Sequence, residues 1–120
     1  MLASLEYAVE HLHVPLIVVM GHKGCGAIQA VFEANGKAMP GHLRELQKHI
    51  DNVIPQGLES EAQPRTELLN QLSKENAKTQ AAILLRASDV IKMAVDNRQV
   101  HVLYGIYDME TGSVDFFDLE

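Results

Sequence analysis

The spacing of hydrophobic residues along the chain predicts alternating helices and strands. Residues 4–13 place apolar side chains three, four and seven positions apart, which indicates an amphipathic helix, and Ser4 is positioned to cap it. Residues 16–20 (LIVVM) lack polar alternation, which is typical of a strand buried on both faces of a parallel sheet. Residues 100–106 form a second such strand. Residues 114–119 form a third, which pairs antiparallel with the second through a short polar turn.

Further helices are predicted between the first two strands. They cover residues 27–34, 41–54, 65–86 and 88–97. Asn35, which precedes a glycine, ends the first of them with a left-handed residue, and Ser88 is placed to cap the last. The polar segment bracketed by Pro55 and Pro64 predicts a loop. Strands joined by helices on both sides of a sheet define an α/β fold, in which a right-handed crossover connects the first two, parallel strands.

Length and composition are typical of one globular domain, which we expect to cover residues 1–120. The chain has 120 residues, of which 47% are hydrophobic and 22% charged. Its net charge of −6 opposes binding to a nucleic-acid backbone or to an anionic membrane. No apolar run approaches the ~20 residues of a membrane span. A single cysteine excludes an internal disulfide and fits a reducing compartment, so we expect a cytoplasmic protein.

A glycine-rich turn at residues 21–26 (GHKGCG) follows the first strand and precedes a helix. Ligands of open α/β sheets bind beyond the carboxyl ends of the strands, so this turn is the candidate site. His22 leaves the strand, and Cys25 lies at a helix N-terminus, where partial positive charge stabilises a thiolate. The pair is compatible with zinc ligation, a reactive or redox thiol, anion binding by the loop amides, or a tight structural turn without chemistry.

Several segments of the chain match one known family in order and spacing. They are residues 4–9 (SLEYAV), residues 16–27 (LIVVMGHKGCGA), Glu75 with Asn76, and the pattern YGIYD…TGSV at residues 104–114. Together they resemble the β-class carbonic anhydrase family, over nearly the whole chain. The turn Gly-His-x-x-Cys-Gly after this strand is the specific part of the resemblance.

The resemblance implies a zinc site and carbon dioxide chemistry. The family holds zinc by Cys, His and Cys, and His22 and Cys25 match the second and third of these ligands. Zinc acidifies water in that family, and the hydroxide attacks carbon dioxide to give bicarbonate. Gly26 matches a position whose backbone N–H binds a substrate oxygen. Tyr7 matches a residue that lines the apolar substrate pocket, often facing the site of a partner subunit.

The family's first zinc ligand lies in a Cys-x-Asp-x-Arg segment that this sequence does not contain. That segment also supplies an Asp–Arg pair that orients the zinc water, and Cys25 is the only cysteine. Catalytic zinc normally has three protein ligands and a water. A third ligand could come from this chain or a partner chain, or a separate polypeptide could supply the missing strands. The site could also be incomplete and inactive, or the loop could act without zinc. Substitute ligands are a carboxylate or one of His11, His13, His42, His49 and His101.

The expected fold is a truncated β-carbonic-anhydrase-like domain that lacks the family's first two strands. It has a small, mostly parallel sheet of about three strands, the last antiparallel, flanked by helices. One edge of the strand at residues 16–20 is then unpaired, and exposed apolar edges tend to pair with other chains. We therefore expect a homo-oligomer, joined through this strand or through the first helix. A non-enzymatic scaffold or interaction protein that retains the fold, and a thiol enzyme that uses Cys25, stay open as alternatives.

Overall fold

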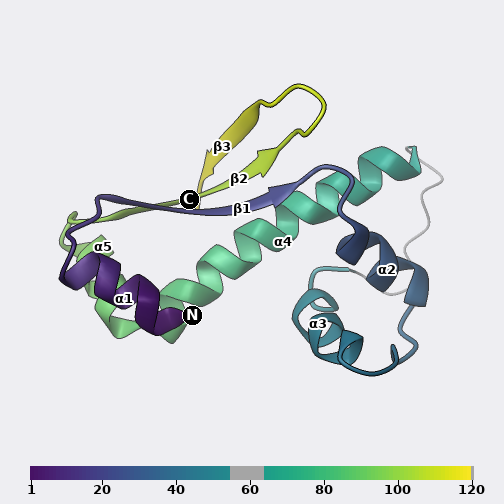
Figure 1. Cartoon of the computed structure of the whole chain (residues 1–120), viewed down its shortest axis with the longest axis horizontal. Helices are drawn as coiled ribbons and strands as arrows, with labels where there is room; N and C mark the ends of the chain where they lie inside the picture. The colour runs from purple at the N-terminus through teal and green to yellow at the C-terminus, as the bar shows by residue number, and fades with distance from the viewer. Residues whose placement is uncertain (55–63, 120) are drawn as a thin grey trace.

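The computed structural model describes residues 1–54 and 64–119, which form five helices and three strands (Figure 1). In chain order these are α1 (Leu2–Glu10), β1 (Leu16–His22), α2 (Gly26–Ala34), α3 (Leu43–Ile50), α4 (Arg65–Ala87), α5 (Asp89–Asp96), β2 (His101–Tyr107) and β3 (Val114–Asp118). The predicted loop between Pro55 and Pro64 lies outside the described residues. No helix in the described part of the chain is both long and apolar enough to cross a membrane.

The three strands form one sheet in the order β1-β2-β3. β1 runs parallel to β2, with Leu16 opposite His101 at one end and His22 opposite Tyr107 at the other. β3 runs antiparallel to β2. Both pairings confirm the prediction, and the predicted α/β class is confirmed with them. β1 lies at the edge of this sheet, so the expected unpaired edge is also present among the described residues.

The larger hydrophobic core lies between one face of the sheet and α4. Ile17 on β1 and the two alanines Ala77 and Ala81 on α4 belong to it, and the short alanine side chains let the helix approach the strands. At Gly21 a Cβ atom would lie 3.2 Å from the carbonyl oxygen of Ser73, so the strand and the helix backbone are close there. Burying a side chain such as isoleucine contributes roughly 1.5–3 kcal/mol to folding. The other buried residues of this core are Val9, Leu84, Ile91, Ala94, Val100, Val102 and Tyr104.

A second core is formed where α2 and α3 pack near the first half of α4. The amide of Gln47 is buried there: its Oε1 accepts from the Met39 N–H at 2.8 Å, and its Nε2 donates to the Lys37 carbonyl at 2.8 Å. Two cores along one long helix make the molecule elongated, with a radius of gyration of 15.8 Å against the ~14 Å of a compact chain. The buried hydrophobic residues of the second core are Ile28, Val31, Met39, Ile50, Leu68 and Leu72.

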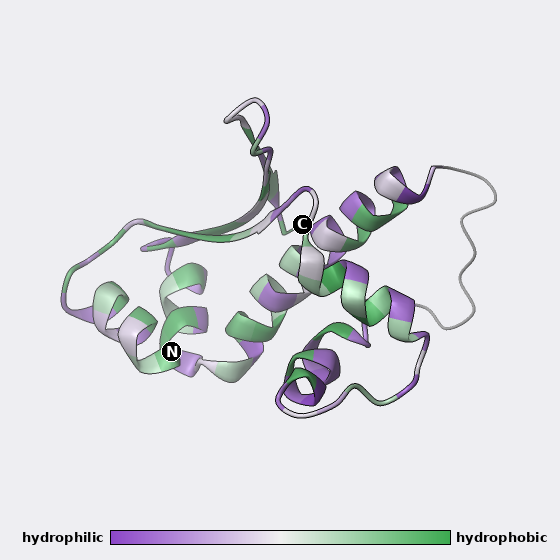
Figure 2. Ribbon diagram, turned by 45° about the vertical axis from the view of Figure 1, so that its right-hand side comes forward, coloured by the Kyte–Doolittle hydropathy of each residue, from purple (hydrophilic) through white to green (hydrophobic). Residues whose placement is uncertain are grey.

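The opposite face of the sheet is uncovered. Figures 1 and 2 show the described helices on one side of the sheet. Leu16, Met20 and Phe116, on the other side, remain 47%, 50% and 55% exposed. The predictions that the first strand is buried on both faces, and that helices flank both sides of the sheet, are therefore wrong for the described chain. The reason is that α1 packs on α5, and α5 on α4, instead of crossing the second face.

The ends of α1 differ from the prediction. The helix begins at Leu2 with Met1 as its N-cap, so the expected cap at Ser4 is wrong. The N–H of Ser4 donates instead to the carbonyl of Met1 at 3.1 Å, inside the first turn. The helix also ends at Glu10 and does not reach residue 13, because His13 takes a left-handed φ of 54° that turns the chain toward β1.

The predicted capping residues at the C-terminal end of α2 and at the N-terminal end of α5 are confirmed. Asn35 ends α2 with φ 48° and ψ 48°, the left-handed conformation predicted for it. Ser88 caps α5, with its Oγ accepting from the Ile91 N–H at 3.2 Å. α3 is shorter than the predicted 41–54, because Gly41 has φ 59° and residues 51–54 form turns.

Candidate functional site

The turn between β1 and α2 carries the two side chains that the sequence pattern indicated. His22 is the last residue of β1, which is two residues longer than predicted, and Cys25 is the N-cap of α2. Gly24 lies between them with φ 70°, a left-handed conformation that glycine adopts without steric cost. Because β1 packs in the larger core and α2 in the second, the turn joins two packed elements.

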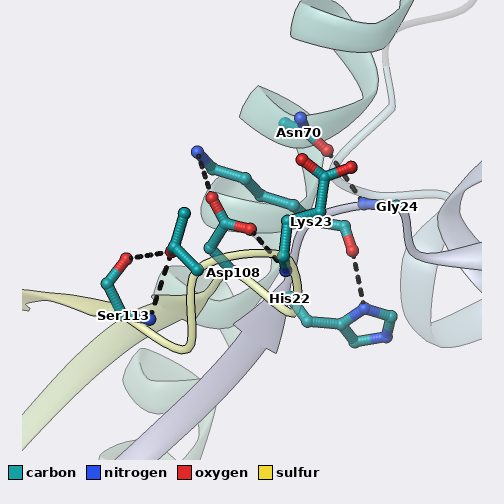
Figure 3. A network of polar contacts seen from close by, with 8 residues as sticks. His22, Lys23, Gly24, Asn70, Asp108 and Ser113 are labelled. Atoms are coloured by element: carbon teal, nitrogen blue, oxygen red, sulfur yellow. Dashed lines mark hydrogen bonds and ion pairs between the residues drawn. The ribbon is translucent and has the colours of Figure 1, made fainter.

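The His22 ring is held by a backbone hydrogen bond. Its Nδ1 lies 2.9 Å from the carbonyl oxygen of Lys23 (Figure 3). A carbonyl oxygen only accepts, so Nδ1 carries the hydrogen and donates it. In the neutral ring this leaves the Nε2 lone pair free to bind a metal ion, the arrangement by which a second hydrogen bond orients a histidine ligand.

Cys25 presents a half-buried free thiol at the edge of the second core. As the N-cap it has φ −69° and ψ 114°, and its side chain makes no capping hydrogen bond. Gly26, the first residue of α2, is exposed, and the N–H of a first helical residue has no acceptor within its own helix. The Cys25 side chain and this N–H are neighbours at the positive end of the helix dipole, a position where backbone N–H groups can hold an anion.

Lys23 fixes the turn to the connection between β2 and β3. Its N–H donates to the Tyr107 carbonyl at 2.9 Å, and its Nζ lies 3.4 Å from Oδ2 of Asp108. The Glu110 N–H, which donates to Asp108 Oδ1 at 2.9 Å, lowers the pKa of this carboxyl below its ordinary value, and Lys23 lowers it further. Asp108 is therefore an ionised partner for the turn at neutral pH.

Asn70 on α4 holds the turn from a second direction. Its side-chain Oδ1 accepts from the Gly24 N–H at 3.0 Å, across 46 positions of sequence (Figure 3). Asn70 could not be predicted from the sequence, because nothing in its local pattern distinguishes it from another polar position of a long helix. Asp108 had a weak signal, since it directly follows an apolar strand run on the neighbouring strand.

Tyr7 does not lie at this turn. It is on α1, its ring stacks on that of His11 with centroids 4.9 Å apart, and it is 56% exposed. α1 precedes the start of β1, whereas the turn follows its end, and a seven-residue strand spans about 20 Å (Figure 1). Tyr7 therefore does not reach the turn of its own chain.

The described residues contain no group of three or more His, Cys, Asp or Glu side chains placed to hold a metal ion. His101, one of the candidates for a third ligand, pairs through Nε2 with Oδ1 of Asp118 at 2.7 Å, near the start of β2 and away from the turn. His22 and Cys25 are thus two donors with a suitable chemistry, imidazole and thiol, on one rigid turn.

Comparison with known proteins gives consistent matches. A family model described as carbonic anhydrase matches residues 1–114. "Carbonic anhydrase 2" of Mycobacterium tuberculosis is 30% identical over 113 residues, which are 92% of this chain and 53% of that protein. The β-carbonic anhydrase CafA of Aspergillus fumigatus has a TM-score of 0.83 and 28% identity, over 98% of this chain and 55% of that one. A Sordaria macrospora structure, from work on two tetrameric β-carbonic anhydrases, shares the fold with a TM-score of 0.76 and 22% identity, over 96% and 58%.

Proposed function

Because the chain belongs to the β-carbonic anhydrase family, we propose that it contributes His22 and Cys25 to a zinc site for the reversible hydration of carbon dioxide to bicarbonate. The chain spans about half the length of the curated relatives it matches. The observation that carries the proposal is the pairing of an imidazole whose Nε2 is free with a half-buried thiol, on the turn where a parallel strand ends.

The two donors fit zinc in type. Soft thiolate and imidazole are the ligands that zinc prefers among protein side chains. They do not fit it in number, because a catalytic site normally has three protein ligands and one water, and the described residues offer two. We therefore place the third ligand outside a single copy of the described chain, on a second copy of it. His22 and Cys25 would hold the ion, which would supply an acidified water for addition to carbon dioxide.

Gly26 and Tyr7 have proposed roles in binding the substrate. The Gly26 N–H is free of an intrahelical acceptor, which suits a hydrogen bond to an oxygen of carbon dioxide or bicarbonate. Tyr7 presents an exposed ring on α1, so its contribution to an apolar pocket would be made to the site of a second copy. The position of Tyr7 therefore supports an oligomeric protein.

We further propose that the chain forms a homo-oligomer through the outer edge of β1 and the uncovered face of the sheet. Leu16, Met20 and Phe116 are exposed there beside a strand edge that lacks a partner among the described residues. The tetrameric relatives from Sordaria macrospora are consistent with association in this fold. If two β1 edges pair about a twofold axis, they run antiparallel, so each His22 lies beside the start of the partner strand and not beside the partner's His22. The single free cysteine supports a reducing compartment, and we propose the cytoplasm.

Metal content and carbon dioxide hydration test the proposal. We expect the purified protein, prepared with zinc, to bind about one zinc per chain and to accelerate hydration in a stopped-flow indicator assay. His22→Ala and Cys25→Ala should both lose the metal and the activity, whereas Lys48→Ala, an exposed lysine on α3 that is not a candidate ligand, should keep both. Less than about a tenth of a zinc per wild-type chain would overturn the proposal.

A non-enzymatic scaffold is the second candidate function. It is favoured by the uncovered apolar face together with a donor set of two. A protein that self-associates but binds no zinc in the same experiment would support the scaffold. Rapid alkylation of Cys25 in metal-free protein at neutral pH, without metal binding, would instead support a thiol enzyme.

A further inference from the structure

We infer that Asn70 and Asp108 are positioning residues, which hold the His22 and Cys25 donors in a fixed relative geometry. The inference rests on the proposed metal-binding role of those two side chains. Neither residue belongs to the donor set itself. Each makes a polar contact with one of the two residues between the donors: Asn70 with Gly24, and Asp108 with Lys23. The two contacts come from different parts of the fold (Figure 3).

Asn70 fixes the middle of the turn. Gly24 is exposed, and a Cβ atom built on it would meet nothing within 4 Å, so side-chain packing does not locate this residue. The hydrogen bond from its N–H to Asn70 Oδ1, at 3.0 Å, does locate it. Asn70 is half-buried on α4, one turn before the buried Ser73 that packs against β1. The contact therefore fixes the turn relative to α4, the helix that packs in both cores.

Asp108 fixes the residue that orients the imidazole. The carbonyl of Lys23 accepts from His22 Nδ1, so movement of this peptide would rotate the ring and its free Nε2. Lys23 is held by its own N–H on Tyr107 and by its ammonium on Asp108, which is in turn held by the Glu110 N–H. The loss of a direct hydrogen-bond partner of a metal ligand, the position of the Lys23 carbonyl, typically changes metal affinity by about 10–100-fold, and Asp108 acts one contact further out.

The variants Asn70→Leu and Asn70→Asp separate positioning from general stability. Leucine has a similar size but no acceptor, whereas aspartate keeps an oxygen for the Gly24 N–H. Three quantities should be measured on the whole protein: hydrogen exchange at the Gly24 amide, the alkylation rate of the single Cys25, and the affinity for Co²⁺ from its thiolate absorption band. Co²⁺ serves as a spectroscopic probe that takes the same imidazole and thiolate ligands as zinc.

We expect Asn70→Leu to speed Gly24 exchange roughly fivefold, as for the loss of one hydrogen bond, and to change the alkylation rate of Cys25. The affinity for Co²⁺ should fall about tenfold. Asn70→Asp should return all three close to wild-type values. Asp108→Asn should weaken Co²⁺ binding about threefold, as for a partly exposed ion pair, while the control Asp96→Asn, which breaks the exposed pair with Lys92 on α5, should leave binding unchanged.

The outcomes distinguish this inference from the proposed function. Faster Gly24 exchange in Asn70→Leu with unchanged Co²⁺ affinity would overturn the positioning role alone, because Asn70 would then be merely structural. Unchanged Gly24 exchange would overturn it as well. A wild-type protein that binds no Co²⁺ would overturn the proposed function and remove the positioning role with it.

Discussion

The two faces of the sheet carry similar side chains and have opposite surroundings. Ile17 is 8% exposed on the face that meets α4, while its neighbour Leu16, on the other face, is 47% exposed. Tyr104 and Phe116 on the adjoining strands repeat the contrast at 6% and 55%. Apolar and polar residues do not alternate along residues 16–20 of β1, so the hydrophobicity of a residue does not decide whether it is buried here. Burial depends instead on which face of the sheet α4 covers, and the other face remains available for contact with another protein surface.

The largest effect should come from truncating adjacent residues of β1. Ile17→Ala removes a buried side chain from the packed core and should cost about 3 kcal/mol of the free energy of unfolding. Leu16→Ala removes a similar volume from the exposed face and should cost less than about 1 kcal/mol. Urea denaturation at low protein concentration measures both. Equal losses in the two variants would show that the uncovered face is packed in solution.

A smaller effect should appear in self-association. Met20→Lys places a charge on the uncovered face, next to the free edge of β1, and should weaken the oligomer about tenfold or more, since a buried methionine contributes roughly 1.5–3 kcal/mol. Met93→Lys is the matched control, on α5, where the methionine is 64% exposed. Sedimentation over a range of concentrations compares them. A stronger effect of Met93→Lys would show that the interface lies on the side of α1 and α5 instead.

Much of the fold could be predicted because its signals are local. The caps at Asn35 and Ser88 depend on residues within one turn of the helix end, and both are confirmed. The burial of β1 could not be predicted in the same way. An apolar run indicates only that a strand can be covered on both faces. Whether it is covered depends on distant helices such as α5, which packs against α1 and α4 instead.

The candidate site shows the same difference between residues indicated by local sequence and residues brought in by the fold. His22 and Cys25 lie within one short turn, so a glycine-rich pattern after a strand was enough to indicate them. Asn70 reaches the turn from another element, and only the three-dimensional structure places it there. Tyr7 came from a family resemblance, which already placed it toward the site of a partner subunit. Its position on α1, before the start of β1 and away from the turn, is compatible with that prediction.

The smallest expected effect on stability comes from the charge of Asp108, which directly follows β2, and not from packing. Asp108 has a folded-state pKa below its ordinary value of 3.8, chiefly because it accepts from the Glu110 N–H and additionally because of Lys23. A lowered pKa stabilises the folded state above the unfolded-state pKa, and this stabilisation is lost as the pH falls through the folded-state pKa. Asp108→Asn should therefore be slightly less stable than wild type near neutral pH, and the difference should vanish as the pH falls through the lowered folded-state pKa. Denaturation at several pH values tests this, with Leu16→Ala as a control whose difference from wild type should not change with pH. A stability difference for Asp108→Asn that grows on acidification would contradict the sign of the effect and show that the carboxyl is not held ionised by these neighbours.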